Sequence, residues 1–375
     1  MHEQLRRRIG RGDFQCSHLA GLWVAGLAIV CAHHWLPPTL THGVLRGAYG
    51  AELLFGLVGF STTWFAVQAR DALVSAGCSP GQALRAIYAR LASRTLPIYF
   101  AFLVAIFFAS EATNETHLAL WTFSYHFLAA MKGELTGTLA HMWAPSIAFW
   151  FCVLWIPSVV YLSRPALLPA VAGLIGLGIA TRMVLAASGS PPVVLRCAGV
   201  TSLDALGSGA LASLLILRHG VPRVAGSRWS LGLLAAGVPW IVWGMVLQYD
   251  RHGGERALWE TFVITTKVPL LFTVLVLGAR EGPGLFGGIF SGAFVRLLAS
   301  ATSGIYLAHA FTPPVLRKMM ALPVLPFGVL ALGAMTCGIG VVLHVFFERR
   351  IARRFFPGGV LEPGSVASED ARRAA

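Results

Sequence analysis

Long apolar segments recur along this chain and restrict the environment in which it can fold. Ten of them run for about 16–26 residues each, long enough to cross a hydrocarbon layer of about 30 Å as tilted helices. Charged residues make up only 12% of the chain, about half the fraction of a soluble domain. The sequence therefore predicts an all-α membrane protein, a bundle of about ten transmembrane helices. The predicted spans are 17–36, 50–68, 95–110, 143–162, 166–187, 203–218, 229–248, 261–279, 297–316 and 322–347.

Two further segments receive a different interpretation. Residues 117–131 are apolar but are interrupted by His117 and His126, so we interpret them as an interfacial or re-entrant piece. The last residues, 357–375, are polar and rich in small side chains, which is typical of a disordered tail. The predicted organisation is one membrane domain over residues 1–356, followed by a cytoplasmic tail over 357–375.

Arginine is distributed unevenly between the two alternating sets of loops. One set, with both chain ends, holds most of the arginines, whereas the other holds few and carries acids such as Glu111 and Glu255. Basic residues flank spans on the cytoplasmic side, so both termini are predicted to be cytoplasmic. The net charge of +13 arises largely from these arginines, which also meet anionic lipid, and no nucleic-acid partner is expected.

Ionisable side chains recur at one depth of the predicted bundle. When the chain is threaded with a cytoplasmic N-terminus, six of them fall toward the non-cytoplasmic side. An ionisable group inside a bilayer costs about 3 kcal/mol or more, so such groups indicate a functional site. The six residues are His34, Glu52, His141, Asp204, Lys267 and His309.

Several local patterns allow both a chemical and a structural interpretation. His34 ends the first predicted span, where a lone histidine is more often an interfacial residue than a general base. Arg90 and Arg94 share one helix face, which suits either cytoplasmic anchoring or a phosphate clamp. Asp204 is either a site residue or a cap at a helix start. Glu348 is expected to form an ion pair or to pack between helices.

The chain also carries an ordered series of short motifs. They are Leu19-x-Gly21-Leu22 with His34, Gly50-x-Glu52-Leu53 with Gly59-Phe60, Arg90 and Arg94 before Pro97-x-Tyr99, Trp143-x-x-Ser146 with Phe151, Leu203-Asp204-Ala205 with Gly209-Ala210, Tyr306-Leu307-x-His309, and Phe347-Glu348-Arg349. In this order the sequence resembles the acyltransferase-3 family of integral membrane O-acyltransferases. The resemblance covers nearly the whole chain, from Leu19 to Phe355.

The resemblance implies transfer of an acyl group, acetyl being the expected one, from cytoplasmic acyl-CoA to a hydroxyl. The acceptor would be an envelope glycan, a lipid-linked sugar or a similar molecule. Acetyl-CoA is the implied donor substrate, with its phosphates at Arg85, Arg90 and Arg94, and no metal is expected. The implied location is the inner (plasma) membrane of a bacterium.

The resemblance also suggests roles for the residues of the predicted membrane site. His34 would deprotonate the acceptor hydroxyl or relay the acyl group. Glu52 or Asp204 would orient its imidazole and stabilise the charged form. Candidates for stabilising a developing oxyanion are Lys267, Tyr306 and His309.

The sequence departs from the family pattern at four positions, and two alternatives stay open. One is a non-catalytic or divergent relative that has left the family's chemistry. The other is a proton-coupled transporter, which intramembrane ionisable residues would suit, although no repeat symmetry is present. The departures are Trp23 and Ser202 in place of Arg, Glu52 in place of Asp, and Ala148 or Phe149 in place of Glu.

Overall fold

The computed structural model describes residues 19–36, 47–109, 113–135, 137–220, 292–319 and 327–355, and every regular element in these ranges is helical. Within these ranges six helices are long and apolar enough to cross a membrane, which indicates a membrane-embedded protein. They are α4 (Gly47–Ser75), α5 (Pro80–Ala109), α8 (Trp143–Tyr161), α9 (Arg164–Ala187), α11 (Leu203–His219), and a continuous helix made of α19 (Val329–Leu343), a π-helical turn (His344–Glu348) and α20 (Arg349–Phe355).

The predicted spans 50–68, 95–110, 143–162, 166–187, 203–218 and 322–347 each overlap one of these six helices. The first predicted span, 17–36, corresponds to α2 (Ala20–Trp35), which is apolar but only 16 residues long. The spans 229–248 and 261–279, the residue Lys267 and the tail 357–375 lie outside the described residues. The total of ten spans and the cytoplasmic termini therefore stay predictions.

Segment 297–316 does not form the single continuous span that we predicted. It is divided among α16 (Ala293–Ser300), α17 (Thr302–Ala308) and α18 (Thr312–Met319). Pro313 and Pro314 supply the reason for the last break. Proline lacks an N–H group and fits only the first turn of a helix, so a new helix starts at Thr312.

Residues 117–131 form short helices, as an interfacial or re-entrant piece requires. They lie in α6 (Asn114–Trp121) and α7 (Tyr125–Lys132), of eight residues each. Eight residues rise about 12 Å, far less than the bilayer core. A similar short helix, α10 (Pro192–Cys197), and the 3₁₀ turns Ala140–Met142 and Val200–Ser202 complete the described elements.

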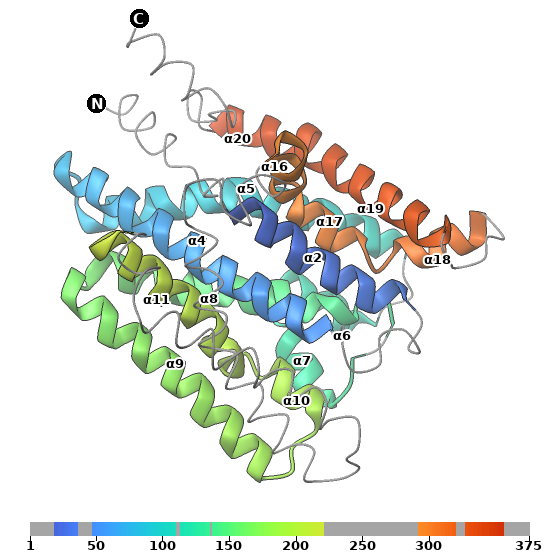
Figure 1. The fold of residues 1–375 in the computed structure, drawn as a ribbon, viewed down its shortest axis with the longest axis horizontal. Helices are drawn as coiled ribbons and strands as arrows, with labels where there is room; N and C mark the ends of the chain where they lie inside the picture. The colour runs from blue at the N-terminus through green and yellow to red at the C-terminus, as the bar shows by residue number, and fades with distance from the viewer. Residues whose placement is uncertain are drawn as a thin grey trace, which may run out of the picture.

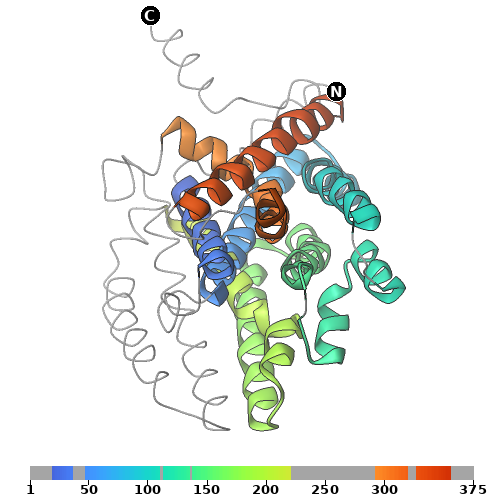
Figure 2. The ribbon, with the colours of Figure 1, turned by 90° about the vertical axis from the view of Figure 1, so that its right-hand side faces the viewer.

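Helices α4 and α11 form the centre of the bundle. In their most apolar stretches 78% and 72% of residues are buried, against 22% in α9 and in α19, so the latter two are peripheral. Figures 1 and 2 show α9 and the α19–α20 helix on opposite flanks. A Cβ on Gly209 would lie 1.8 Å from the carbonyl oxygen of Gly56, and one on Gly59 would lie 1.9 Å from that of Leu206. Glycine thus permits the close approach of the two central helices.

The antiparallel helices give the bundle two distinct ends (Figure 1). At one end Arg70, near the end of α4, donates to the carbonyl oxygens of Val159 (2.7 Å) and Leu162 (3.2 Å), and Asp71 pairs with Arg164. We call this the arginine end. The other is the histidine end, where α8 begins directly after His141. The 19 residues of α8 separate the two ends by about 28 Å.

The orientation of this axis in the membrane can be tested by cysteine labelling. Cys78 lies between α4 and α5 at the arginine end, and Asn114 starts α6 on an exposed surface. We expect a membrane-impermeant maleimide to miss Cys78 in sealed cells and to label Asn114→Cys, because arginine-rich flanks stay cytoplasmic. Labelling of Cys78 in sealed cells would reverse the predicted orientation.

Candidate functional site

Three histidine rings and one tyrosine ring gather at the histidine end. The centroid of the His309 ring lies 5.0 Å from that of His34, 4.8 Å from that of His141 and 5.1 Å from that of Tyr306. They come from α2, the 3₁₀ turn before α8, and α17 with the residue after it, so the cluster exists only in the folded bundle. We call these four residues the imidazole cluster.

Burial differs sharply within the imidazole cluster. His34 is exposed, whereas His141 and His309 retain 3% and 0% of their accessible surface. His34 also lies close enough to Arg196, at the end of α10, to interact with it electrostatically. His34 is therefore the most accessible imidazole of this cluster, and its ring contacts that of the buried His309.

Hydrogen bonds define the chemical state of His309. Its Nδ1 faces the carbonyl oxygen of Tyr306, which can only accept, so Nδ1 carries the proton. In a neutral ring the Nε2 atom is then a bare acceptor. That atom is buried and has no hydrogen-bond partner among the described residues. A buried acceptor without a donor is costly, and such an atom marks a place where chemistry or binding supplies the partner.

Two more hydrogen bonds connect side chains at the imidazole cluster to backbone carbonyl oxygens. The Tyr306 hydroxyl donates to the carbonyl oxygen of His141 at 3.0 Å, and Trp35 Nε1 donates to that of His309 at 3.0 Å. In this arrangement neither Tyr306 nor His309 directs a proton toward an oxyanion. Their predicted role as oxyanion donors would require these bonds to rearrange.

Asp204 forms its ion pair with an arginine and not with an imidazole. Both of its carboxylate oxygens accept from Arg182, which also donates to the carbonyl oxygen of Thr201. Arg182 and Asp204 retain 3% and 1% of their accessible surface, so this is a buried ion pair between α9 and α11. Glu52, half-buried on α4, lies near enough to act on Asp204 electrostatically. The structure thus pairs Asp204 with a guanidinium, where the sequence suggested an imidazole.

The sequence pattern assigns no partner to two of these residues. Arg182 is a lone arginine inside an apolar span, a position that is itself a signal of function or pairing. His141 was recognised as an ionisable residue at the right depth, but its partner His309 is 168 positions away. Only the packing of α17 near the start of α8 brings them together.

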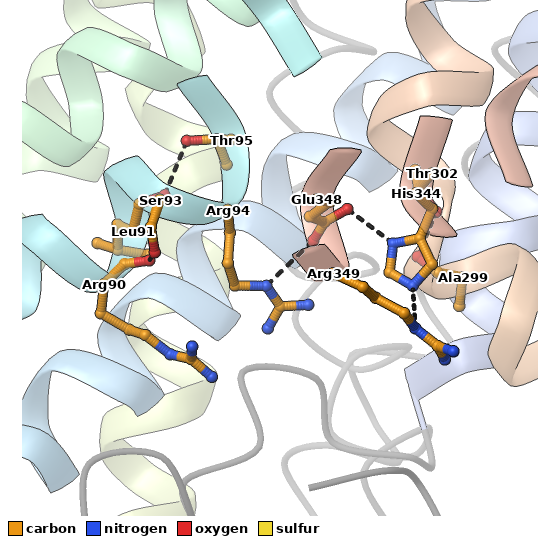
Figure 3. Close-up of polar contacts among 10 residues, drawn as sticks. All are labelled: Arg90, Leu91, Ser93, Arg94, Thr95, Ala299, Thr302, His344, Glu348 and Arg349. Carbon is orange, nitrogen blue, oxygen red and sulfur yellow. Dashed lines mark hydrogen bonds and ion pairs between the residues drawn. The ribbon is translucent and has the colours of Figure 1, made fainter. Parts of the chain in front are cut away.

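A second polar cluster joins α5 to the C-terminal helix (Figure 3). Arg94 Nε donates to Glu348 Oε1 at 3.2 Å, His344 Nδ1 donates to Glu348 Oε2 at 2.7 Å, and Arg349 Nε donates to His344 Nε2 at 3.2 Å. The predicted ion-pairing role of Glu348 is confirmed. Arg90, one turn before Arg94, is 7% exposed, whereas Arg85 lies on the exposed surface. We call Arg90, Arg94, His344, Glu348 and Arg349 the guanidinium cluster.

Helix α5 connects the two clusters. Phe102 on α5 packs against Phe311, with ring centroids 5.2 Å apart, and Phe311 lies 5.9 Å from the His141 ring. Arg94 precedes Phe102 by eight residues on the same helix, a rise of about 12 Å. Arg94 and the aromatic contact that leads to the imidazole cluster are thus offset along the helix axis by roughly that distance.

No family model, curated protein or solved structure matches this chain. Within the described ranges, no group of three or more His, Cys, Asp or Glu side chains is arranged to hold a metal ion. The two clusters and the ordered sequence motifs are therefore the features that bear on function.

Proposed function

We propose that this protein is an integral membrane O-acyltransferase. It would move an acyl group, acetyl in the expected case, from acyl-CoA on the cytoplasmic side to a hydroxyl of an envelope glycan, a lipid-linked sugar or a similar acceptor. The observation that carries the proposal is the contact between the exposed ring of His34 and the buried ring of His309 inside a membrane bundle. The sequence motifs that resemble acyltransferase-3 proteins contain both of these histidines.

The guanidinium cluster suits the donor. Guanidinium groups match phosphate geometry and keep their charge, so Arg90 and Arg94 would bind phosphates of acyl-CoA. Its extended acyl-bearing arm would then cover the offset of about 12 Å along α5 toward the imidazole cluster. A donor with its charge at one end and its reactive thioester at the other fits this spacing.

The imidazole cluster suits the acceptor. The His34 imidazole would take the proton of the acceptor hydroxyl as its oxygen attacks the thioester carbonyl. The carbon–sulfur bond then breaks, and the CoA thiolate leaves and takes the proton from the His34 imidazolium. The ring of His309 contacts that of His34, and its bare Nε2 would accept a hydrogen bond from His34, which would orient the base as the third member of a triad does.

The function can be tested in a bacterial strain that lacks this chain. Mass spectrometry of envelope glycans and lipids from the deletion strain and its parent should show a species that has lost the mass of one acyl group. Acceptor extracted from the deletion strain should then stimulate CoA release by the purified protein. If no envelope species changes while uptake of a solute is lost, the transporter alternative replaces this proposal.

The donor site gives a kinetic prediction. Replacing Arg90 and Arg94 by Ala should raise KM for acetyl-CoA more than it lowers kcat, because a phosphate remote from the reacting carbon is bound similarly in ground and transition states. Arg218→Ala, an exposed position in the last turn of α11, is the control and should change KM far less. A fall in kcat at unchanged KM would contradict phosphate binding by the pair.

A further inference from the structure

The charged groups around His34 are basic. Those that act on its ring electrostatically are His33 and Arg196. Within the described part of the chain, no carboxylate forms an ion pair with either His34 or Arg196. The two carboxylates proposed from the sequence as partners of this imidazole, Glu52 and Asp204, are not among the groups that act on it. The described residues therefore supply no counter-ion to the imidazole that we assign as the base.

The two buried histidines of the imidazole cluster bring no negative charge either. His141 Nδ1 faces the carbonyl oxygen of Thr138 at 2.9 Å, and His309 Nδ1 faces that of Tyr306. Carbonyl oxygens only accept, so Nδ1 carries the proton in both rings. Their Nε2 atoms are buried and have no hydrogen-bond partner among the described residues, and a buried ring without a counter-charge is neutral. When His34 takes up a proton, the new positive charge thus forms near a guanidinium and two uncharged rings.

The residues after Arg196 fix its place at this end of the bundle. Arg196 lies in the last turn of α10, which packs against α7 (Figure 1), and its side chain is exposed. The next residue, Cys197, is fully buried, and a Cβ on Gly199 would lie 3.2 Å from the His126 ring. Gly199 also has a φ of +72°, which favours glycine. The backbone that carries Arg196 is therefore held by packing, while its guanidinium is accessible to a ligand.

We infer that Arg196 binds an anionic group of the acceptor, a phosphate or a carboxylate close to the hydroxyl that is acylated. A guanidinium matches the geometry of both oxyanions. The bound anion also stabilises the imidazolium that forms on His34, because opposite charges attract and the described part of the site offers no carboxylate to that ring. This inference rests on the proposed function. It narrows the acceptor to anionic glycans and to sugars that are linked to a lipid through phosphate.

Two matched pairs of synthetic acceptors test the charge requirement. Prenyl phosphoglucose is compared with prenyl glucoside, which lacks the phosphate, and methyl glucuronide with methyl glucoside, which lacks the carboxylate. CoA release from acetyl-CoA is measured with the full-length protein in detergent. In at least one pair the charged acceptor should have a kcat/KM about tenfold or more above that of its neutral counterpart. The pair that shows the difference identifies the source of the anion.

Variants at Arg196 connect this preference to one side chain. Arg196→Ala should remove the preference by raising KM for the charged acceptor, whereas Arg196→Lys keeps the charge and should retain part of it. Lys132→Ala is the matched control, because Lys132 is a basic residue on α7, the helix that α10 packs against, and already pairs with Glu115 at 3.0 Å. The control should leave the preference unchanged.

Binding of the charged acceptors, measured by calorimetry, separates this inference from the proposed function. If the wild type binds one of them through Arg196 but transfers no acyl group to it, the anion site stands and the acyltransferase function fails. If Arg196→Ala binds and acylates the charged acceptors as well as the wild type does, the function stands and this inference fails. Equal use of charged and neutral acceptors by the wild type, or binding of neither charged acceptor, also overturns the inference.

Discussion

We expect His34→Ala to lower the rate of acyl transfer about 100- to 10,000-fold while the protein still folds and inserts. The large kinetic effect follows from the loss of a general base. The small structural effect follows from its position, because His34 is exposed at the penultimate residue of α2. Insertion depends on the apolar length of the spans, which this change leaves intact. The measurement is acyl transfer by purified protein, compared at equal amounts of folded material.

His33→Ala is the control for this prediction. His33 is also exposed, and its ring centroid lies 5.3 Å from that of His34. Adjacent helix residues are about 100° apart, so His33 cannot replace His34 beside His309 without rotation of α2. His33→Ala should therefore be mild. If His33→Ala loses transfer and His34→Ala keeps it, the base has been assigned to the wrong histidine; if neither change matters, the chain lacks the proposed chemistry.

The largest expected effect on stability belongs to Asp204→Ala. Removal of this carboxylate leaves the guanidinium of Arg182 buried without its counter-charge, which costs about 3–5 kcal/mol. The Arg182→Met, Asp204→Leu double variant should recover most of that loss, because it removes both charges and keeps apolar volume. Thermal unfolding of the purified protein in detergent measures both effects.

An exposed ion pair serves as the comparison. Glu115 and Lys132 join α6 to α7 at 3.0 Å, with side chains 71% and 42% exposed. Glu115→Ala should cost about 1 kcal/mol or less, because solvent already screens this pair. An Asp204→Ala protein as stable as the Glu115→Ala protein would show that Arg182 finds another partner or reaches water, and that the buried pair does not support the bundle.

Close helix packing was foreseeable from particular residues. Small side chains such as those after Asp204 permit a tight helix contact, and Gly209 lies directly against the backbone of α4 at Gly56. The apolar character of 297–316 predicts one continuous span, whereas Pro313 and Pro314 start a new helix at Thr312. The apolar length of a segment indicates whether it can lie in lipid. It does not indicate whether the segment forms one continuous helix.

The membrane environment, the helical architecture and the shared depth of His34, His141 and His309 can all be predicted from the linear chain. Apolar length and the alternation of spans are properties of that chain, so they can be counted along it. Which side chains are partners depends on how the helices pack. The packing pairs Asp204 with Arg182 and Glu348 with Arg94 and His344. Buried charges and hydrogen-bonding atoms must find partners wherever the packed helices bring them, and that choice depends on helix rotation and contact, which the linear order does not specify.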